Sequence, residues 1–176
     1  TAGALSGARE AVAKYTIGAG TGLGGFFARI RFGTSDAAYV AGARMFLGFS
    51  ATTTAPTNVE PGTVANTFGL AQISTSDNLC IVARDASSSI TPIDLGSDFP
   101  ANNNSIAYEL ALFSPPSGGV YWQVSRLNHT AEASGYLSSN LPASSTLLCL
   151  QTWRSNNATA LAVGLDLCGI YIETDY

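Results

Sequence analysis

Short runs of alternating polar and apolar residues follow one another along most of the chain. In Phe26–Phe32, every second residue is apolar, and Arg29 and Arg31 fall together on the opposite face. Because successive side chains of a β-strand point to opposite faces, this period of two predicts a strand whose arginine face lies in solvent. The run Arg44–Phe49 is more continuously apolar, which is typical of a strand covered on both faces.

Further strands are predicted where similar runs are separated by clusters of Gly, Pro, Asn, Asp and Ser. From residue 68 onward these are Phe68–Ile73, Leu79–Arg84, Ile90–Leu95, Ile106–Phe113, Val120–Leu127, Ala133–Leu137, Thr146–Trp153, Ala160–Leu167 and Ile170–Ile172. Turn residues join the first two of these runs, and also the fourth and fifth, so each of those pairs predicts a hairpin. Helical spacing never persists over a comparable length.

The spacing of these strands indicates the fold class. Strand signals recur every ~8 to 12 residues without intervening helical patterns. They predict an all-β fold of about eleven strands, an antiparallel β-sandwich of the jelly-roll or concanavalin-like kind, rather than a parallel α/β sheet. A length of 176 residues suits one domain. Residues 1–25 are small and Gly-rich and predict a linker plus a first strand, and residues 26–176 predict a single β-sandwich head domain.

Composition and charge narrow the classes of partner. Charged residues make up 11% of the chain and apolar residues 46%, which is not a disordered composition. Lys and Arg together number 8 against 12 acids, so no basic stripe is available for nucleic acid. No apolar stretch approaches the ~18 residues of a membrane span, so we expect no membrane insertion. The chain begins with Thr1 and shows no signal-peptide pattern, and we expect it to be a fragment of something longer.

Motifs for cofactor binding and nucleophilic catalysis are weak. The glycine pattern of Gly20–Gly25 matches a dinucleotide-binding loop, but the strand-like run Phe26–Phe32 follows it where such a site needs a helix. We interpret it as an ordinary loop. A catalytic Ser or Cys needs a base, and the single His, His129, lies between two strand patterns with no nucleophile elbow in the chain. We interpret His129 as a turn residue.

Metal-binding motifs are equally sparse. Cys80, Cys149 and Cys168 each lie in an apolar run and none belongs to a CxxC pair, which predicts buried, inert thiols and no zinc site. A calcium site would draw on the scattered aspartates Asp77, Asp85, Asp94 and Asp98. Because no EF-hand loop surrounds them, we predict no metal and no cofactor.

Paired carboxylates are the enzymatic alternative, because lectin-like sandwiches can host glycosidases that use two acids on one sheet face. Glu109 and Asp166 each have a place in an alternating pattern that would direct them toward a sheet face. Only Glu173 and Asp175 stand two residues apart, and their position near the end of the chain predicts a solvated terminus. We therefore predict no catalytic residue and no enzymatic activity.

Aromatic and amide side chains offer a binding site instead. Trp and Tyr rings stack on sugar faces, while Asn, Ser and Arg hydrogen-bond to hydroxyl groups. Two clusters have this composition, one in a strand and one where a strand pattern passes into a turn. The candidate ligand-binding residues are Tyr121, Trp122, Trp153, Arg154, Asn156 and Asn157. The competing interpretation of both tryptophans is a core position or a contact between subunits.

Several segments carry a pattern that extends over residues 44–176. They are Phe46–Ser50, Ala55–Val59 with Pro61, Ile93–Gly96, Phe99–Pro100, Tyr108–Pro116, Leu141–Ala143, Trp153–Ala160 and Tyr171–Tyr176. Together they resemble the C-terminal domains of tailed-bacteriophage tail-fibre and related virion proteins. The three cysteines are not part of that pattern.

The resemblance implies a virion component at a fibre tip that contacts a host surface. It carries no catalytic motif, and such tips are generally trimers, so it implies a non-enzymatic homotrimer whose partner is a bacterial cell-surface polysaccharide or protein. A surface rich in Ser, Thr and Asn suits a polysaccharide, because it exchanges hydrogen bonds with water for hydrogen bonds to sugar hydroxyls. The alternatives are a structural virion domain without receptor contact, a cellular lectin module and a glycoside hydrolase sandwich.

Overall fold

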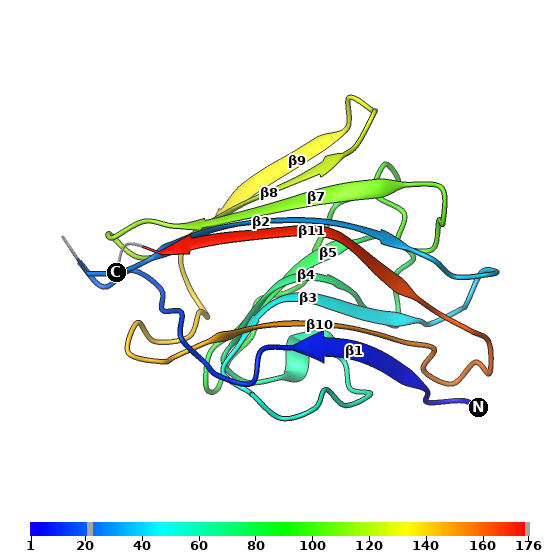
Figure 1. Ribbon diagram of the computed structural model, residues 1–176, viewed down its shortest axis with the longest axis horizontal. Coiled ribbons are helices and arrows are strands. Elements are labelled where there is room, and N and C mark those ends of the chain that lie inside the picture. The colour runs from blue at the N-terminus through cyan, green and yellow to red at the C-terminus, as the bar shows by residue number, and fades with distance from the viewer. Residues whose placement is uncertain (21–22, 175–176) are drawn as a thin grey trace.

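The computed structural model describes residues 1–20 and 23–174, which form two antiparallel sheets packed face to face (Figure 1). The strands are β1 (Leu5–Arg9), β2 (Phe26–Thr34), β3 (Arg44–Ser50), β4 (Thr67–Gln72), β5 (Cys80–Arg84), β6 (Ile93–Asp94), β7 (Ala107–Ser114), β8 (Val120–Arg126), β9 (Glu132–Leu137), β10 (Cys149–Ser155) and β11 (Leu165–Thr174). One 3₁₀ turn, η1, spans Pro61–Thr63. The predicted antiparallel β-sandwich is confirmed. In the described part of the chain no helix is long and apolar enough to cross a membrane.

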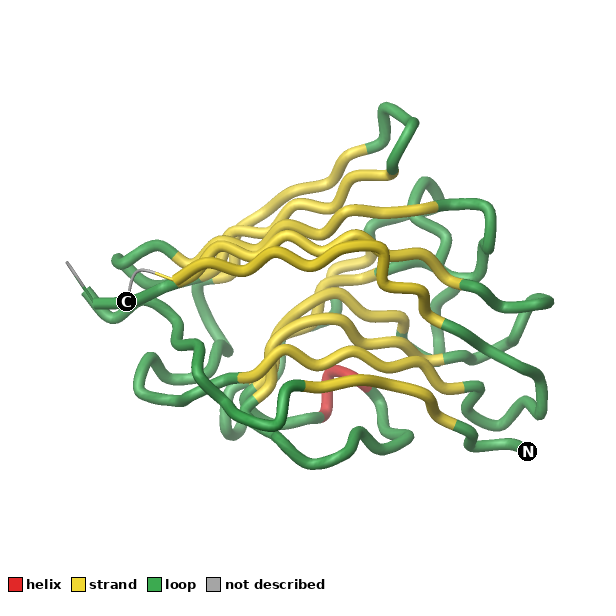
Figure 2. The backbone as a smooth tube through the Cα atoms, in the orientation of Figure 1, coloured by secondary structure: helices red, strands yellow, loops and turns green. Residues whose placement is uncertain are grey.

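The two layers differ in strand order. The five-stranded sheet, upper in Figure 1, runs β11-β2-β7-β8-β9, and the six-stranded sheet below it runs β1-β10-β3-β4-β5-β6. Both predicted hairpins are present, as the pairs β4–β5 and β7–β8. The N-terminal strand β1 lies at the edge of the six-stranded sheet beside β10, so segments from opposite ends of the chain are neighbours in Figure 2.

The main core fills the space between the sheets with the apolar half of each alternating strand. The ring centroids of Phe26 and Phe49 lie 4.5 Å apart, and those of Phe49 and Phe68 lie 5.6 Å apart, so rings from both sheets interlock. Edge and tilted contacts of this kind add to the free energy of area burial. The other half of β2 carries Arg29 and Arg31, which are exposed, as the alternation predicts.

A second, smaller core covers the outer face of the six-stranded sheet. Phe46, Val82 and Trp153 are at most 2% exposed there and pack with Cys80. The segment 51–66, which includes η1, lies over these residues and lines a small hollow beside Trp153. Strand β3 is therefore covered on both faces, as its continuous apolar run predicts.

The C-terminal strands differ from the prediction. In place of the predicted strands Ala160–Leu167 and Ile170–Ile172 there is one strand, β11, which continues through a register shift between Leu167 and Gly169. Residues 160–164 form no strand, because side chains bind this backbone: the Asn156 Nδ2 group donates to the Leu161 carbonyl at 2.9 Å. The predicted strand Ile90–Leu95 shortens to the two residues of β6.

The three thiols are in different environments. Cys80 and Cys149 are buried, as predicted, but Cys168 is exposed on the edge strand β11, so the prediction was wrong for that residue. Cys168 falls at the register shift between Leu167 and Gly169, so it has no residue opposite it on β2. Burial raises the pKa of the Cys80 thiol to about 12, and it raises the pKa of Cys149 as well.

We therefore expect one fast-reacting thiol in the folded protein. A thiol reacts as the thiolate, which burial suppresses at Cys80 and Cys149. Ellman's reagent at mildly alkaline pH should label one Cys rapidly in the folded protein and all three after denaturation. A Cys168→Ser variant should lose the fast phase, and fast labelling that survives this substitution would contradict the assignment.

Candidate functional site

Trp153, one of the predicted binding residues, faces the outer side of the six-stranded sheet but lies beneath the covering segment. It is 2% exposed, and its ring centroid lies 6.4 Å from that of Phe46. Its indole therefore has no face available to a sugar in this structure. This is the core position that the competing interpretation proposes.

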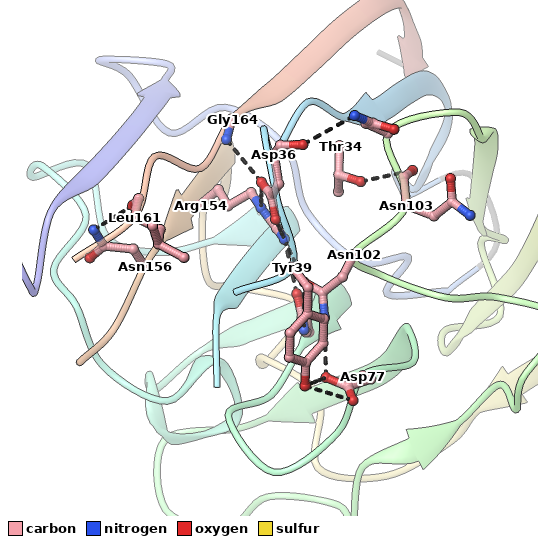
Figure 3. A network of polar contacts seen from close by, with 12 residues as sticks. Thr34, Asp36, Tyr39, Asp77, Asn102, Asn103, Arg154, Asn156, Leu161 and Gly164 are labelled. Atoms are coloured by element: carbon pink, nitrogen blue, oxygen red, sulfur yellow. Dashed lines mark hydrogen bonds and ion pairs between the residues drawn. The ribbon is translucent and has the colours of Figure 1, made fainter. Parts of the chain in front are cut away.

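Arg154 points in the opposite direction, into one end of the sandwich, and is fully buried. Its Nε donates to Asp36 Oδ1 at 2.7 Å, and its Nη2 donates to Asp36 Oδ2 (Figure 3). The Nη1 group donates to Gln72 Oε1 at 3.0 Å, and Nη2 also donates to Asn102 Oδ1 at 2.9 Å. Asp36 is buried as well, so the guanidinium is neutralised inside the protein and does not face a ligand.

The network around this ion pair continues to the surface. Asn102 Nδ2 donates to Asp77 Oδ1 at 3.1 Å, and the Tyr39 hydroxyl donates to the same carboxylate at 3.0 Å (Figure 3). On the other side, the Gly164 N–H donates to Asp36 Oδ1 at 3.1 Å. The ion pair thus connects β10 to the segments that follow β2 and precede β11, which belong to the other sheet.

Asn156 and Asn157 also serve the local fold. Asn156 is 2% exposed, and its Nδ2 group donates to the Thr1 and Leu161 carbonyls at 3.0 and 2.9 Å. Asn157 adopts a left-handed backbone with φ of 47°, a conformation that Asn tolerates in turns. The predicted cluster from Trp153 to Asn157 is therefore split between two cores and a turn.

The second predicted cluster divides between the two faces of β8. Trp122 is 6% exposed and belongs to the main core, where its indole lies against Gly135 of β9: a Cβ on that glycine would fall 2.5 Å from the ring. Tyr121 is 50% exposed on the outer face of the five-stranded sheet. Three of the six predicted site residues are aromatic, and of these Tyr121 is exposed while Trp122 and Trp153 are buried.

Strand register places Tyr121 in a row of aromatic side chains across the outer face. Opposite pairs run Phe27–Phe113, Phe113–Tyr121 and Tyr121–Tyr136, from β2 to β9. The Tyr121 ring centroid lies 4.5 Å from that of Tyr136 and 6.3 Å from that of Phe113. We call these four residues the aromatic row.

Beside the aromatic row lies a polar row with small members. Arg29 stands opposite Ala111, Ala111 opposite Gln123, and Gln123 opposite Ser134. Because Ala111 and Ser134 are short, they leave a hollow of about 490 Å³ between the two rows. Its lining combines apolar ring surface with the amide of Gln123 and the hydroxyl of Ser134.

A third row is charged. Glu109 accepts from Arg31 Nε at 2.6 Å, and Arg29 Nε lies 2.8 Å from its other oxygen. Partial burial raises the pKa of this carboxyl, but the hydrogen bonds from Arg31 and Arg29 outweigh it and lower the pKa overall. Glu109 therefore stays ionised and engaged with both arginines.

The remaining candidate acids are also engaged. Asp166 accepts from the Ser35 hydroxyl at 3.1 Å, and Glu173 accepts from the Tyr171 hydroxyl at 2.5 Å. Asp175 lies outside the described residues. Within the described ranges, no group of three or more His, Cys, Asp or Glu side chains is arranged to hold a metal ion.

The two other motifs that the sequence offered lie in loops. Residues 21 and 22 of the glycine pattern Gly20–Gly25 lie outside the described residues, and strand β2 follows the pattern directly. The His129 Nδ1 atom accepts from the Ala131 N–H at 3.0 Å in the turn before β9. This hydrogen bond agrees with its interpretation as a turn residue.

Sequence reasoning found one member of the aromatic row and missed three. The alternation of Phe26–Phe32 puts Phe27 on the face of the outward arginines, and that of Ile106–Phe113 puts Phe113 on the face of Glu109, which was a usable signal. What it lacked was register, because only the pairing of β2 with β7 and of β7 with β8 brings these rings into line with Tyr121. Tyr136 comes from the edge strand β9, whose neighbour could not be read from its own alternation.

No protein-family model and no curated protein sequence matches the chain. Among solved structures it is similar to lectin II from Ulex europaeus, with 13% identity and a TM-score of 0.64 over 97% of this chain and 81% of that one. It is also similar to peanut lectin, with 9% identity and a TM-score of 0.67 over 99% and 81%. A family 7 alginate lyase aligns with 9% identity and a TM-score of 0.52 over 96% and 69%. At these identities the likeness shows the fold alone.

The Arg154–Asp36 pair provides a test of the structural assignment. Removing one partner of a buried ion pair leaves an uncompensated charge and costs about 3 to 5 kcal/mol. We expect Arg154→Met and Asp36→Leu each to lower the free energy of unfolding in urea by about this amount, and the double variant to lose less than the sum. Arg126→Met is the control for loss of an arginine. A loss near zero at both positions would show that the pair does not hold the sheets.

Proposed function

We propose that this domain binds glycans, without catalysis, through the outer face of its five-stranded sheet. The observation that carries the proposal is the aromatic row, in which Phe113, Tyr121 and Tyr136 are each between 44% and 50% exposed. A contiguous exposed apolar patch with polar residues at its rim is typical of a binding site. The rings stand on paired strands, so they are held in place before a ligand arrives.

The chemistry of the face suits a sugar. A pyranose ring has apolar C–H faces that pack on aromatic rings and hydroxyl groups at its rim that need hydrogen-bond partners. The hollow between the rows provides both, with ring surface from Tyr121 and polar groups from Gln123 and Ser134. Similar folds include a lectin solved in complex with galactose and an alginate lyase solved in complex with substrate, which supports the class of ligand.

Binding without turnover is supported by the state of the nearest acid. A glycosidase uses one carboxyl group as a proton donor and needs its pKa raised. The pKa of Glu109 is lowered instead, and both of its oxygens face arginines. This carboxylate is suited to fixing Arg29 and Arg31 and is unsuited to donating a proton.

At the finer level, we propose the receptor-binding head of a bacteriophage tail fibre, acting as a homotrimer in the virion on a bacterial surface glycan. The support is the sequence resemblance over residues 44–176. A trimer would present three copies of the aromatic row to a repetitive polysaccharide, and linked sites gain avidity without any new contact. Weak single sites are then sufficient for adhesion.

The aromatic row gives the first functional prediction. We expect Tyr121→Ala and Tyr136→Ala each to weaken retention on a panel of bacterial surface polysaccharides by about tenfold, because each removes a stacking ring. Affinity electrophoresis of the folded variants measures this change. Tyr39→Ala removes an equally exposed tyrosine outside the face and should bind like the wild type. Equal retention of all three variants would overturn the proposed site.

The proposed homotrimer gives the second functional prediction. Light scattering at micromolar concentration should return the mass of a trimer, because a fibre tip assembles through its apolar subunit surfaces. A stable monomer would contradict the fibre-tip assignment while leaving the glycan site open to the retention experiment.

A further inference from the structure

Arg29 of the polar row forms a charged cluster with Arg31 and Glu109 of the third row, and this cluster holds more positive than negative charge. Arg29 and Arg31 stand two residues apart on β2, on the same face, and share the single carboxylate of Glu109. Like charges so placed repel each other, and one acid offsets only half of the pair's charge. These three side chains therefore carry a net charge of +1 in a chain whose overall net charge is −4, and the next acid along β11, Glu173, is engaged by the Tyr171 hydroxyl.

Both guanidinium groups have room to donate hydrogen bonds to an anion besides Glu109. Each faces Glu109 through Nε, and the two side chains are 46% and 50% exposed, so part of each guanidinium surface faces solvent. A guanidinium offers five donors in a planar fork that matches the two oxygens of a carboxylate. Arginine is thus better suited than lysine to recognise a second carboxylate at this place.

The cluster borders a hollow of its own. Arg29, Arg31, Gly169, Ile170 and Tyr171 line a space of about 250 Å³ on the same face. Gly169 stands opposite Arg31 and adds no side chain to this space, and a Cβ placed there would meet nothing within 4 Å. The hollow provides room for a small planar group beside the two arginines.

The two hollows are close enough to serve one ligand. Arg29 stands directly opposite Ala111, which lines the larger hollow. Gln123 lies two strands from Arg29, a separation of about 10 Å at the usual strand spacing. An oligosaccharide stacked on the aromatic row would therefore bring its next ring to the arginines.

We infer that the glycan this face binds is acidic, with a sugar carboxylate held by Arg29 and Arg31 while a neighbouring ring stacks on the aromatic row. This inference rests on the proposed function, since it names the ligand class of the same site. The negative charge of the whole chain disfavours nonspecific attraction of polyanions, so recognition depends on the local contact.

The experiment compares sugars that differ only in charge. Polygalacturonate, alginate and hyaluronate are each presented beside their carboxyl-reduced forms, which keep the rings and lose the negative charge. We expect at least one acidic polymer to bind the wild type about tenfold more tightly than its reduced form. Polyglutamate, which has carboxylates and no rings, should bind no better than the reduced polymers.

Variants assign the preference to the cluster. Arg29→Gln should remove the difference between an acidic polymer and its reduced form, and Arg29→Lys should restore only part of it. Glu109→Gln should tighten acidic binding, because it frees both arginines, and Gly169→Leu should weaken it by filling the hollow. Arg126→Gln, on the core-facing side of the same sheet, is the charge-matched control.

The outcomes separate this inference from the proposal beneath it. If polysaccharides bind through Tyr121 but acidic and reduced forms bind alike, the acidic specificity is overturned and the glycan site stands. If polyglutamate binds as tightly as the acidic sugars, the cluster recognises charge and not a sugar. Retention of none of the acidic polymers also overturns the inference.

Discussion

The buried pair of Arg154 and Asp36 is the interaction on which the arrangement of the two sheets depends. Taking two charges out of water is costly, and the cost is offset only where hydrogen bonds satisfy the remaining donors and acceptors. Gln72, Asn102 and the Gly164 N–H provide them. Because these groups come from both layers, the pair stabilises one relative placement of the sheets and disfavours others.

The two outer faces of the sandwich differ in how far they are covered by other parts of the chain. The six-stranded sheet is covered by the segment 51–66, which buries Phe46 and Trp153, whereas the aromatic row of the five-stranded sheet faces water. Asp36 of the ion pair follows β2, and Gly164, which donates to Asp36, precedes β11. These two strands carry Phe27, Arg29 and Tyr171. The ion pair that positions the two sheets therefore also positions the strands that carry these exposed rings and arginines.

Alternation along the chain was sufficient to predict the sandwich, both hairpins and the outward arginines, because a strand's two faces are encoded locally. It was insufficient for the site, which depends on neighbours across strands. The run from Trp153 to Asn157 has the composition of a sugar site, yet Trp153 and Arg154 point to opposite sides of β10 into two cores. Which face of a fully buried strand is covered, and by what, is a tertiary property that periodicity does not contain.

The site proposed for glycans takes its side chains from four adjacent strands, and this arrangement has consequences for how it would bind. Paired strands hold Tyr121 and Gln123 with little freedom, so a ligand loses its own entropy on binding but orders little of the protein. The face is open and shallow, which exposes one side of a sugar and limits the affinity of a single copy. An open face accepts internal units of a long polymer, whereas a closed pocket selects chain ends. Such geometry suits repeating polysaccharides, and in the proposed trimer several copies would bind one chain at once.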